Sequence, residues 1–258
     1  MENNNNNNGS NSSSVHRMFG MHPVFEAINS GANIEKVYLK QGLDGLRFRE
    51  LMDLMNEKGI NYQFVPMEKL NALTKGARHQ GVVATISQIE HIPMEEAVEI
   101  ALQRGKDALV VLLDGVSDVR NFGAIARSAE CAGAGAIILP AKGGAAVNAD
   151  AIKSSAGALL RINSSKVPNL KMAIFHLQDA GFQVIAATER ADKSIYEINF
   201  KQPTAILMGS EDKGISPSLL ALCNDSAKIP MIGEIGSLNV SVATSIVLFE
   251  AIRQRVGK

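Results

Sequence analysis

Short apolar runs alternate with amphipathic segments through the second half of this sequence, and this alternation constrains the fold more than any other feature. Residues 109–113 read LVVLL, an unbroken apolar run typical of a strand that is covered on both faces. Further strands are predicted over residues 136–139, 183–188, 205–208 and 227–229. Together these runs predict an α/β fold with a mostly parallel sheet and helices on both faces.

The segments between these strands carry apolar residues at helical spacing. Glycine and proline punctuate several of them, as they do at helix ends. Helices are predicted over residues 122–133, 149–156, 170–181, 217–222 and 240–255.

The first third of the chain shows a smaller α/β pattern of its own. Helices are predicted over residues 22–29, 46–58 and 67–73, and strands over residues 36–39, 62–65 and 82–86. We therefore expect a small domain over 15–90, a connecting segment over 91–106 with a helix at 94–103, and a larger domain over 107–258. Residues 1–14 are nearly all Asn, Ser and Gly, which predicts a disordered tail.

Charge and composition limit the classes of function. The 26 basic residues balance the 26 acidic ones, which argues against a strongly basic nucleic-acid binder. A basic patch can nevertheless coexist with an acidic face. Aromatic residues make up 5% of the chain and Trp is absent, which argues against any mechanism that needs many base-stacking rings.

Several familiar sites are missing from the sequence. No apolar run approaches the roughly 20 residues that cross a bilayer, and the N-terminus is too polar for a signal peptide, so a cytoplasmic protein with no membrane partner is expected. Cys131 and Cys223 lack metal-ligand spacing, and no metal is expected. No G-x-G-x-x-G, P-loop, H-E-x-x-H or G-x-S-x-G pattern occurs in a suitable position.

Three polar blocks follow predicted strands, where open α/β sheets bind their ligands. In the first, Asn121 and Arg127 fit either a helix cap and a surface ion pair, or contacts to a ribose hydroxyl and a phosphate. The second, from Gly209 to Gly214, fits either a surface turn or a backbone contact with a ligand. In the third, Asn239 is predicted to cap the last helix and also to point into a site.

Taken together and in this order, the three blocks resemble the SpoU family of RNA ribose 2′-O-methyltransferases, also called the TrmH family. They comprise residues 113–129, residues 206–215, and residues 229–231 with 237–243. Residues 153–158 (KSSAGA) also resemble a family segment, for which helix packing is the expected role.

The resemblance implies methyl transfer from S-adenosylmethionine to a ribose 2′-hydroxyl, in a cofactor site formed by a deep trefoil knot of the SPOUT type. The implied cofactor contacts are Thr188, Glu189, Gly209, Ile229 and Leu238. The implied catalytic residues are Arg127, Asn121, Glu211, Ser237 and Asn239. Because a guanidinium is almost never deprotonated, we expect the arginine to hold an RNA phosphate while the other four orient it and the ribose.

The small domain carries two further family segments, G-x-H-x-V-x-E-A over residues 20–27 and HQGV over residues 79–82. They imply a substrate-binding domain with RNA contacts at His22, Arg78, His79 and Gln80, although a structural role is the alternative for both histidines. The layout is most similar to family members that modify a guanosine of 23S ribosomal RNA. The alternatives are transfer RNA, another ribosomal RNA site, and a non-catalytic RNA-binding or ribosome-assembly factor. The family also implies a homodimer that uses the last helix.

One position departs from the family pattern. The first block usually reads D-P-x-N, whereas here Val119 follows Asp118 and precedes Arg120 and Asn121. Proline would fix the backbone before Asn121, so the rigidity of this loop needs another source.

Overall fold

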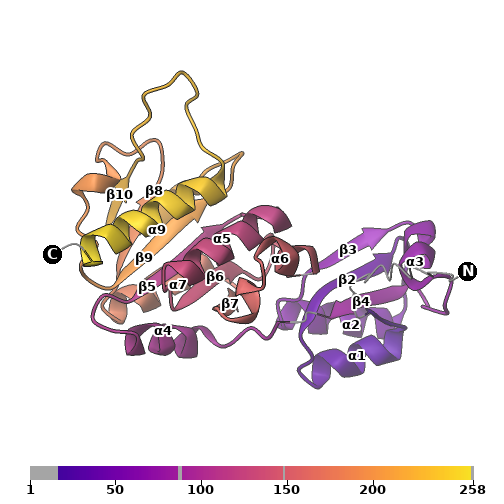
Figure 1. Cartoon of the computed structure of the whole chain (residues 1–258). Helices are drawn as coiled ribbons and strands as arrows, with labels where there is room; N and C mark the ends of the chain where they lie inside the picture. The colour runs from indigo at the N-terminus through magenta and orange to yellow at the C-terminus, as the bar shows by residue number, and fades with distance from the viewer. Residues whose placement is uncertain (1–16, 87–88, 148, 257–258) are drawn as a thin grey trace, which may run out of the picture.

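The computed structural model describes residues 17–86, 89–147 and 149–256, and the tail predicted over 1–14 lies outside them. Two sheets form two domains, joined by the segment that precedes α4 (Figure 1). No helix in the described ranges is long and apolar enough to cross a bilayer.

The small domain is built on a four-stranded sheet of order β1-β4-β2-β3. The pair β2–β3 is parallel, and β4 runs antiparallel to both of its neighbours. The strands are β1 (Arg17–Phe19), β2 (Ile34–Lys40), β3 (Tyr62–Val65) and β4 (Val82–Ile86).

Helices cover both faces of this small sheet. On one face, α1 (Met21–Asn29) and α2 (Leu46–Glu57) bury apolar residues against Val37 and Leu39 of β2. On the other, α3 (Met67–Thr74) packs on the opposite side chains of the same strands. The predicted small α/β domain is thereby confirmed, with β1 as an additional three-residue strand.

The larger domain holds six strands in the order β10-β8-β9-β5-β6-β7, and every pair is parallel. The predicted parallel sheet is confirmed. The strands are β5 (Leu109–Asp114), β6 (Ala136–Pro140), β7 (Asn163–Val167), β8 (Gln183–Ala187), β9 (Thr204–Gly209) and β10 (Asp225–Ala227). Strand β7 was not predicted, because its sequence NSSKV has no apolar run and it forms the edge of the sheet.

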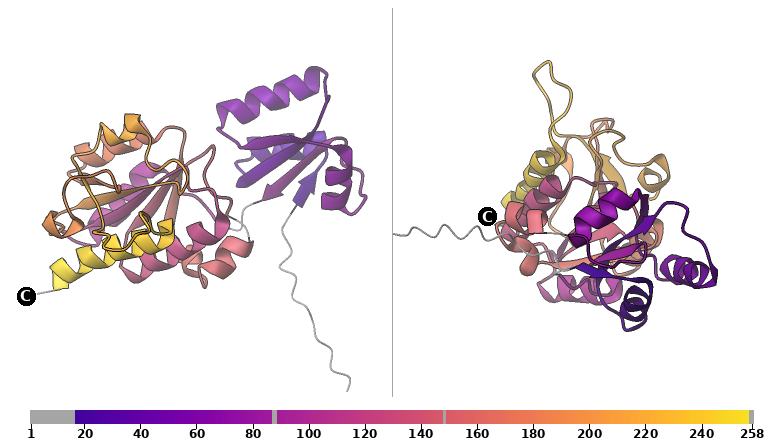
Figure 2. Two further views of the ribbon diagram at one scale, coloured as in Figure 1. Left: turned by 90° about the horizontal axis from the view of Figure 1, so that it is seen from above. Right: turned by 90° about the vertical axis from the view of Figure 1, so that its right-hand side faces the viewer.

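Alternate residues of the central strands belong to two hydrophobic cores. Leu109, Val111 and Leu113 of β5 face one core, whereas Val110 and Leu112 face the other. The first core is covered by α5 (Val119–Cys131), α6 (Ala149–Ser154) and α9 (Val240–Val256). The second is covered by α4 (Met94–Gln103), α7 (Leu170–Asp179) and α8 (Pro217–Leu220). Short 3₁₀ turns complete the fold at Ala158–Leu160 and Ile195–Glu197. The yellow α9 lies along α5 on one side of the sheet (Figure 2).

Glycine at position 123 allows α5 and α6 to approach closely. A Cβ on Gly123 would lie 1.9 Å from Oγ of Ser154 and 2.7 Å from the carbonyl oxygen of Ala151. The hydroxyl of Ser154 also donates to the carbonyl of Val119 at 3.3 Å. The small residues of the first block therefore admit a helix backbone rather than a ligand here, and segment 153–158 has the packing role that was expected.

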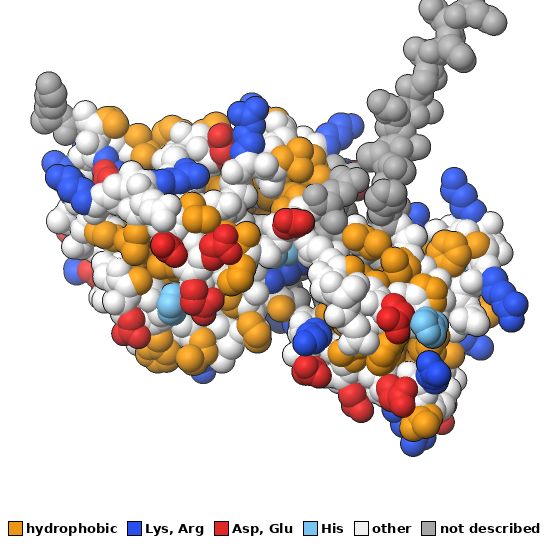
Figure 3. Space-filling view, turned by 90° about the horizontal axis from the view of Figure 1, so that it is seen from below, with side chains coloured by type: hydrophobic (Ala, Val, Ile, Leu, Met, Phe, Trp, Pro, Cys, Tyr) orange, Lys and Arg blue, Asp and Glu red, His pale blue; other side chains and the backbone are white. Residues whose placement is uncertain are grey.

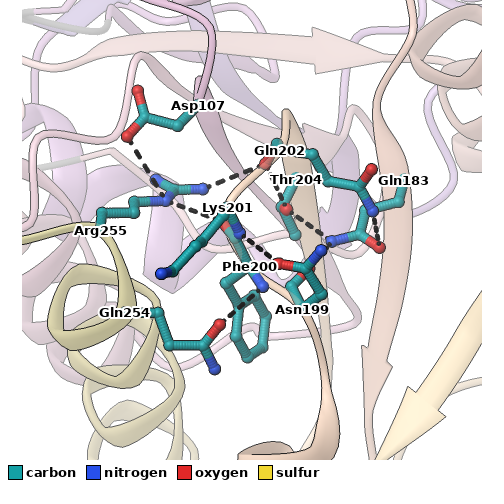
Figure 4. Close-up of polar contacts among 9 residues, drawn as sticks. All are labelled: Asp107, Gln183, Asn199, Phe200, Lys201, Gln202, Thr204, Gln254 and Arg255. Atoms are coloured by element: carbon teal, nitrogen blue, oxygen red, sulfur yellow. Dashed lines mark hydrogen bonds and ion pairs between the residues drawn. The ribbon is translucent and has the colours of Figure 1, made fainter. Parts of the chain in front are cut away.

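The C-terminal turn of α9 is held by polar contacts to the crossover between β8 and β9 (Figure 4). Oε1 of Gln254 accepts from the amide of Phe200 at 2.9 Å, and Nε of Arg255 donates to the carbonyl of Phe200 at 2.9 Å. Asp107 lies 4.0 Å from the same guanidinium. These contacts anchor the end of α9 that lies opposite Asn239.

The two domains meet along β7 and the segment that precedes α4. Nζ of Lys166 donates to Oε2 of Glu35 at 3.1 Å, and the glutamate side chain is only 4% exposed. A cavity of about 590 Å³ lies between the domains beside this pair. Seen from below, the surface is hollowed between the two lobes, and acidic and basic side chains are interspersed on both (Figure 3).

His91 lies at this junction. Burial, together with the charge of Lys166, lowers the pKa of His91 from 6.5 to about 3, against the opposing effect of a hydrogen bond with Ser164. Nδ1 of His91 lies 2.9 Å from the hydroxyl of Ser164. Among the residues that the structure describes, Nε2 finds no hydrogen-bond partner and is buried. The folded protein therefore holds this imidazole neutral.

Candidate active site

The three polar blocks meet at the carboxyl ends of the central strands. Strands β5 and β9 end side by side, with Asp114 opposite Gly209. Oδ2 of Asp114 accepts from the amide of Ser216 at 2.8 Å, which ties the residue after the second block to the end of β5. The first block opens α5 directly after β5, and the third leads into α9, which packs on α5.

Asn239 joins all three blocks through its side-chain amide. Its Nδ2 donates to Oδ1 of Asn121 at 3.0 Å and also to Oε1 of Glu211. Its Oδ1 accepts from the amide of Ser241 at 3.0 Å and from the hydroxyl of Ser241 at 2.6 Å, and so caps α9. The predicted cap is confirmed, and the same side chain reaches the other two blocks, while its role in a functional site stays a prediction.

Asp118 caps α5 and supplies the rigidity that the missing proline would give. Its Oδ1 accepts from the amides of Arg120 and Asn121 at 2.9 and 2.8 Å. The capping role that was considered for Asn121 therefore belongs to Asp118. Because the cap fixes the backbone at Asn121, the side chain of Asn121 remains available to Asn239.

Two adjoining cavities lie beside this polar cluster, with volumes of about 260 and 100 Å³. Thr188, Glu189 and Leu238 line both cavities, Gly209 lines the larger and Ile229 lines the smaller. All five predicted cofactor contacts thus lie around one connected space. Met208 and Ala243 add apolar surface to both cavities, so the walls combine an apolar floor with a polar rim.

Glycine is required at position 209 for a reason that differs from the expected contact with a ligand. A Cβ at this position would lie 2.2 Å from the carbonyl carbon of Gly214 and 2.3 Å from the amide nitrogen of Ile215. The amide of Gly214 donates to the carbonyl of Ser210 at 2.9 Å and closes the turn. Gly209 is therefore needed so that the chain can fold back on itself beneath the cavity.

A third cavity, of about 450 Å³, lies on the other side of Glu211. It is lined by Asp118, Asn121, Glu211 and Lys213, and it shares Glu211 and Lys213 with the 260 Å³ cavity. Sequence reasoning did not assign Asp118 or Lys213 to the site. The signal for Lys213 was its place in the second block, between the two glycines that form the turn.

Two predicted catalytic residues are not hydrogen-bonded to the polar cluster in the described part of the chain. Ser237 lines the 260 and 100 Å³ cavities, yet it forms no hydrogen bond with Asn121, Glu211 or Asn239 in the described part of the chain. Arg127 is exposed on α5, and no hydrogen bond or ion pair joins it to these described side chains. Its neighbour Ser128 shares a 2.7 Å hydrogen bond with Ser245 of α9.

In the small domain, the two family segments lie against one another. Oε1 of Gln80 accepts from the amide of Met21 at 3.4 Å. His79 is buried, with Nε2 3.0 Å from Oδ1 of Asn71 and Nδ1 accepting from the amide of Gly81 at 3.1 Å. These contacts favour the structural role for His79. The side chains of His22, Arg78 and Gln80 are exposed, and their contact with RNA stays a prediction.

Profiles of two protein families match the chain. The profile described as RNA 2′-O ribose methyltransferase substrate binding matches residues 18–92, and that of the SpoU rRNA Methylase family matches residues 108–249. The chain belongs to the SpoU family. The SpoU profile spans all three blocks, so the residues joined by Asn239 lie within the family's methylase domain.

Individual SpoU relatives are similar over most of their length. The 23S rRNA (guanosine-2′-O-)-methyltransferase RlmB of Photobacterium profundum is 35% identical, over 92% of this chain and 97% of the relative. RlmB of Xanthomonas axonopodis pv. citri is 37% identical, over 92% and 96%. The crystal structure of the SpoU methyltransferase AviRb from Streptomyces viridochromogenes, in complex with the cofactor AdoMet, has a TM-score of 0.58 and 26% identity. It covers 93% of this chain and 90% of AviRb.

Proposed function

We propose that this protein is a cytoplasmic methyltransferase that modifies the ribose 2′-hydroxyl of a guanosine in 23S ribosomal RNA, with S-adenosylmethionine as its methyl donor. The observation that carries the proposal is the joining of Asn121, Glu211 and Asn239 by one side-chain amide beside the connected cavities. The RlmB relatives are named for this reaction.

The residues around the connected cavities suit the cofactor. The apolar floor suits an adenine ring, while Thr188 and Glu189 at the rim offer hydrogen-bonding groups to a ribose or an amino acid. When bound there, S-adenosylmethionine would supply a methyl group from its sulfonium. Transfer of that methyl group leaves a neutral thioether. We further propose that the segments around this site form the trefoil knot that the SpoU family implies.

The chain's own residues would position the RNA and its hydroxyl. Arg127 would hold the phosphate next to the target ribose, because a guanidinium binds phosphate in a bidentate manner and stays protonated. Asn121, Glu211, Asn239 and Ser237 would orient the ribose. The hydroxyl proton would then pass to phosphate or to water, since a hydroxyl is a weak nucleophile until its proton is accepted.

We also propose that the protein acts as a homodimer that forms through α9. Val242, Phe249 and Val256 recur every seven residues on this helix and remain 46, 49 and 75% exposed. Apolar residues at this spacing form a stripe along the helix, which suits packing against a second helix. Arg127 is exposed on α5, which packs on α9, and we propose that a second copy docked here brings each Arg127 to the partner's cleft.

The experiment that tests the proposal is a map of ribose methylation in total RNA from cells with and without this protein. Loss of methylation at one guanosine of 23S ribosomal RNA is the expected result. Loss confined to transfer RNA or to another ribosomal RNA would show that this RNA, and not 23S ribosomal RNA, is the substrate. A methylation map that does not change would favour the non-catalytic alternative.

A further inference from the structure

Three of the chain's few aromatic rings gather at one edge of the small domain. Phe64 of β3 packs edge to face against Phe48 of α2, with ring centroids 6.3 Å apart, and against Tyr62 of β3 at 6.0 Å. We call these three residues the aromatic edge. In the described part of the chain β3 is the last strand of its sheet, and Phe64 remains 43% exposed.

The aromatic edge lies beside the larger domain at the loop that follows β6. Nζ of Lys142 lies 6.0 Å from the ring centroid of Tyr62, and β3 begins next to the larger domain (Figure 1). A Cβ on Gly59 would also lie 3.7 Å from the side chain of Ala141 in that loop. The two domains therefore touch where β3 starts.

The same loop reaches the candidate active site. Gly143, next to Lys142, lines the 450 Å³ cavity together with Asp118 and Asn121. Lys142 therefore lies between the aromatic edge and the cavity that contains Asn121. A cation between exposed rings and a polar cavity suits a nucleic-acid strand, because bases stack on rings and ammonium groups neutralise phosphates.

We propose that the aromatic edge stacks an unpaired base that flanks the target nucleotide, while Lys142 binds a phosphate between that base and the target ribose. The inference rests on the proposed function and adds a subsite to it. Stacking requires a base with a free face, so the substrate is a single-stranded loop or bulge rather than a continuous duplex.

A protein partner is the competing occupant of an exposed aromatic patch. The aromatic edge lies next to Lys142, within a domain whose profile is described as substrate binding for RNA 2′-O ribose methyltransferases. This positive charge favours a polyanion, so we assign the edge to RNA.

The test compares Phe64→Leu with Phe64→Trp in steady-state methyl transfer to in-vitro-transcribed 23S ribosomal RNA. Leucine keeps an apolar side chain but removes the ring face, so the KM for RNA should rise about tenfold with kcat little changed. Tryptophan keeps a ring and should stay near wild type. The matched control is Phe175→Leu on α7, which replaces a ring that is 45% exposed on the other domain and should leave the KM unchanged.

A second variant tests the phosphate contact. Filter binding of the same RNA at several salt concentrations should give Lys142→Ala a salt dependence that is shallower by about one released counterion. Calorimetric titration with S-adenosylmethionine should match wild type for both Phe64→Leu and Lys142→Ala. The inference is overturned if both variants keep the wild-type KM and salt slope while the wild-type protein methylates the RNA. Failure of the wild-type protein to methylate any RNA would instead contradict the proposed function.

Discussion

Asn239 and Asn121 lie 118 residues apart in the chain, and Nδ2 of Asn239 donates a 3.0 Å hydrogen bond to Oδ1 of Asn121. The same Nδ2 donates to Glu211, and the oxygen of the same amide caps α9. One side chain therefore couples the start of the last helix to both other blocks. Its two roles can be separated by substitution.

Asn239→Ser should keep the helix cap and lose the bridge. A serine hydroxyl caps helices about as well as asparagine, but it is too short to reach Asn121 and Glu211. We expect methyl transfer to fall by about 100-fold, by analogy with removal of one oriented donor from an active site. Asn239→Ala should lose both roles and cost about 1 kcal/mol more in the free energy of unfolding. Single-turnover assays and urea titrations measure the two effects. Wild-type turnover by the serine variant would show that the bridge is not needed.

Gly209→Ala should disrupt the turn beneath the cofactor cavity. The added Cβ would collide with the backbone of Gly214, and such overpacking costs about 1–3 kcal/mol. We expect lower stability and loss of S-adenosylmethionine binding, as measured by urea unfolding and calorimetric titration. Gly233→Ala is the matched control, because a Cβ there meets no atom within 4 Å. Equal affinity in the two variants would contradict this account of Gly209.

Stability should depend on pH through His91. Its folded pKa of about 3 lies below the ordinary 6.5, so between these values the unfolded chain binds a proton that the folded chain does not. The contribution of neutral His91 to the free energy of unfolding is therefore fully present above pH 6.5 and is lost as the pH falls toward 3. At pH 5 the loss should be about 2 kcal/mol. Urea unfolding from pH 5 to 8 measures this slope, and His91→Asn should flatten it. An equal slope in both proteins would assign the dependence to other groups.

Dimer formation through α9 predicts complementation between inactive variants. Arg127→Ala and Asn239→Ser should each be at least about 100-fold less active alone. If each Arg127 serves the partner's cleft, a mixed dimer has one intact site, and random exchange restores roughly a quarter of wild-type activity. The activity recovered after mixing tests complementation, and sedimentation tests dimer formation. A monomer in sedimentation, or no recovery after confirmed exchange, would contradict the arrangement.

The parallel sheet followed from the sequence because its central strands are apolar on both faces, as in LVVLL at β5. Strand β7 did not follow, because Ser164 and Ser165 are buried at the sheet edge by α4, by the segment before it and by the 3₁₀ turn at Ala158–Leu160 rather than by any apolar pattern of their own. In the site, the capping role of Asn239 was predictable, because this residue of the third block lies directly before α9. The collision that requires Gly209 was not, since it depends on a turn that only the folded backbone shows. The exposure of Arg127 likewise depends on which face of α5 it occupies.

The central claim is that the cleft around Asn121, Glu211 and Asn239 transfers a methyl group to a ribose oxygen. The most direct test incubates the purified protein with methyl-labelled S-adenosylmethionine and 23S ribosomal RNA, and then digests the RNA to nucleosides. The account predicts that the label appears in 2′-O-methylguanosine, and that Arg127→Ala removes it. Label on a base, or undiminished labelling by Arg127→Ala, would contradict it.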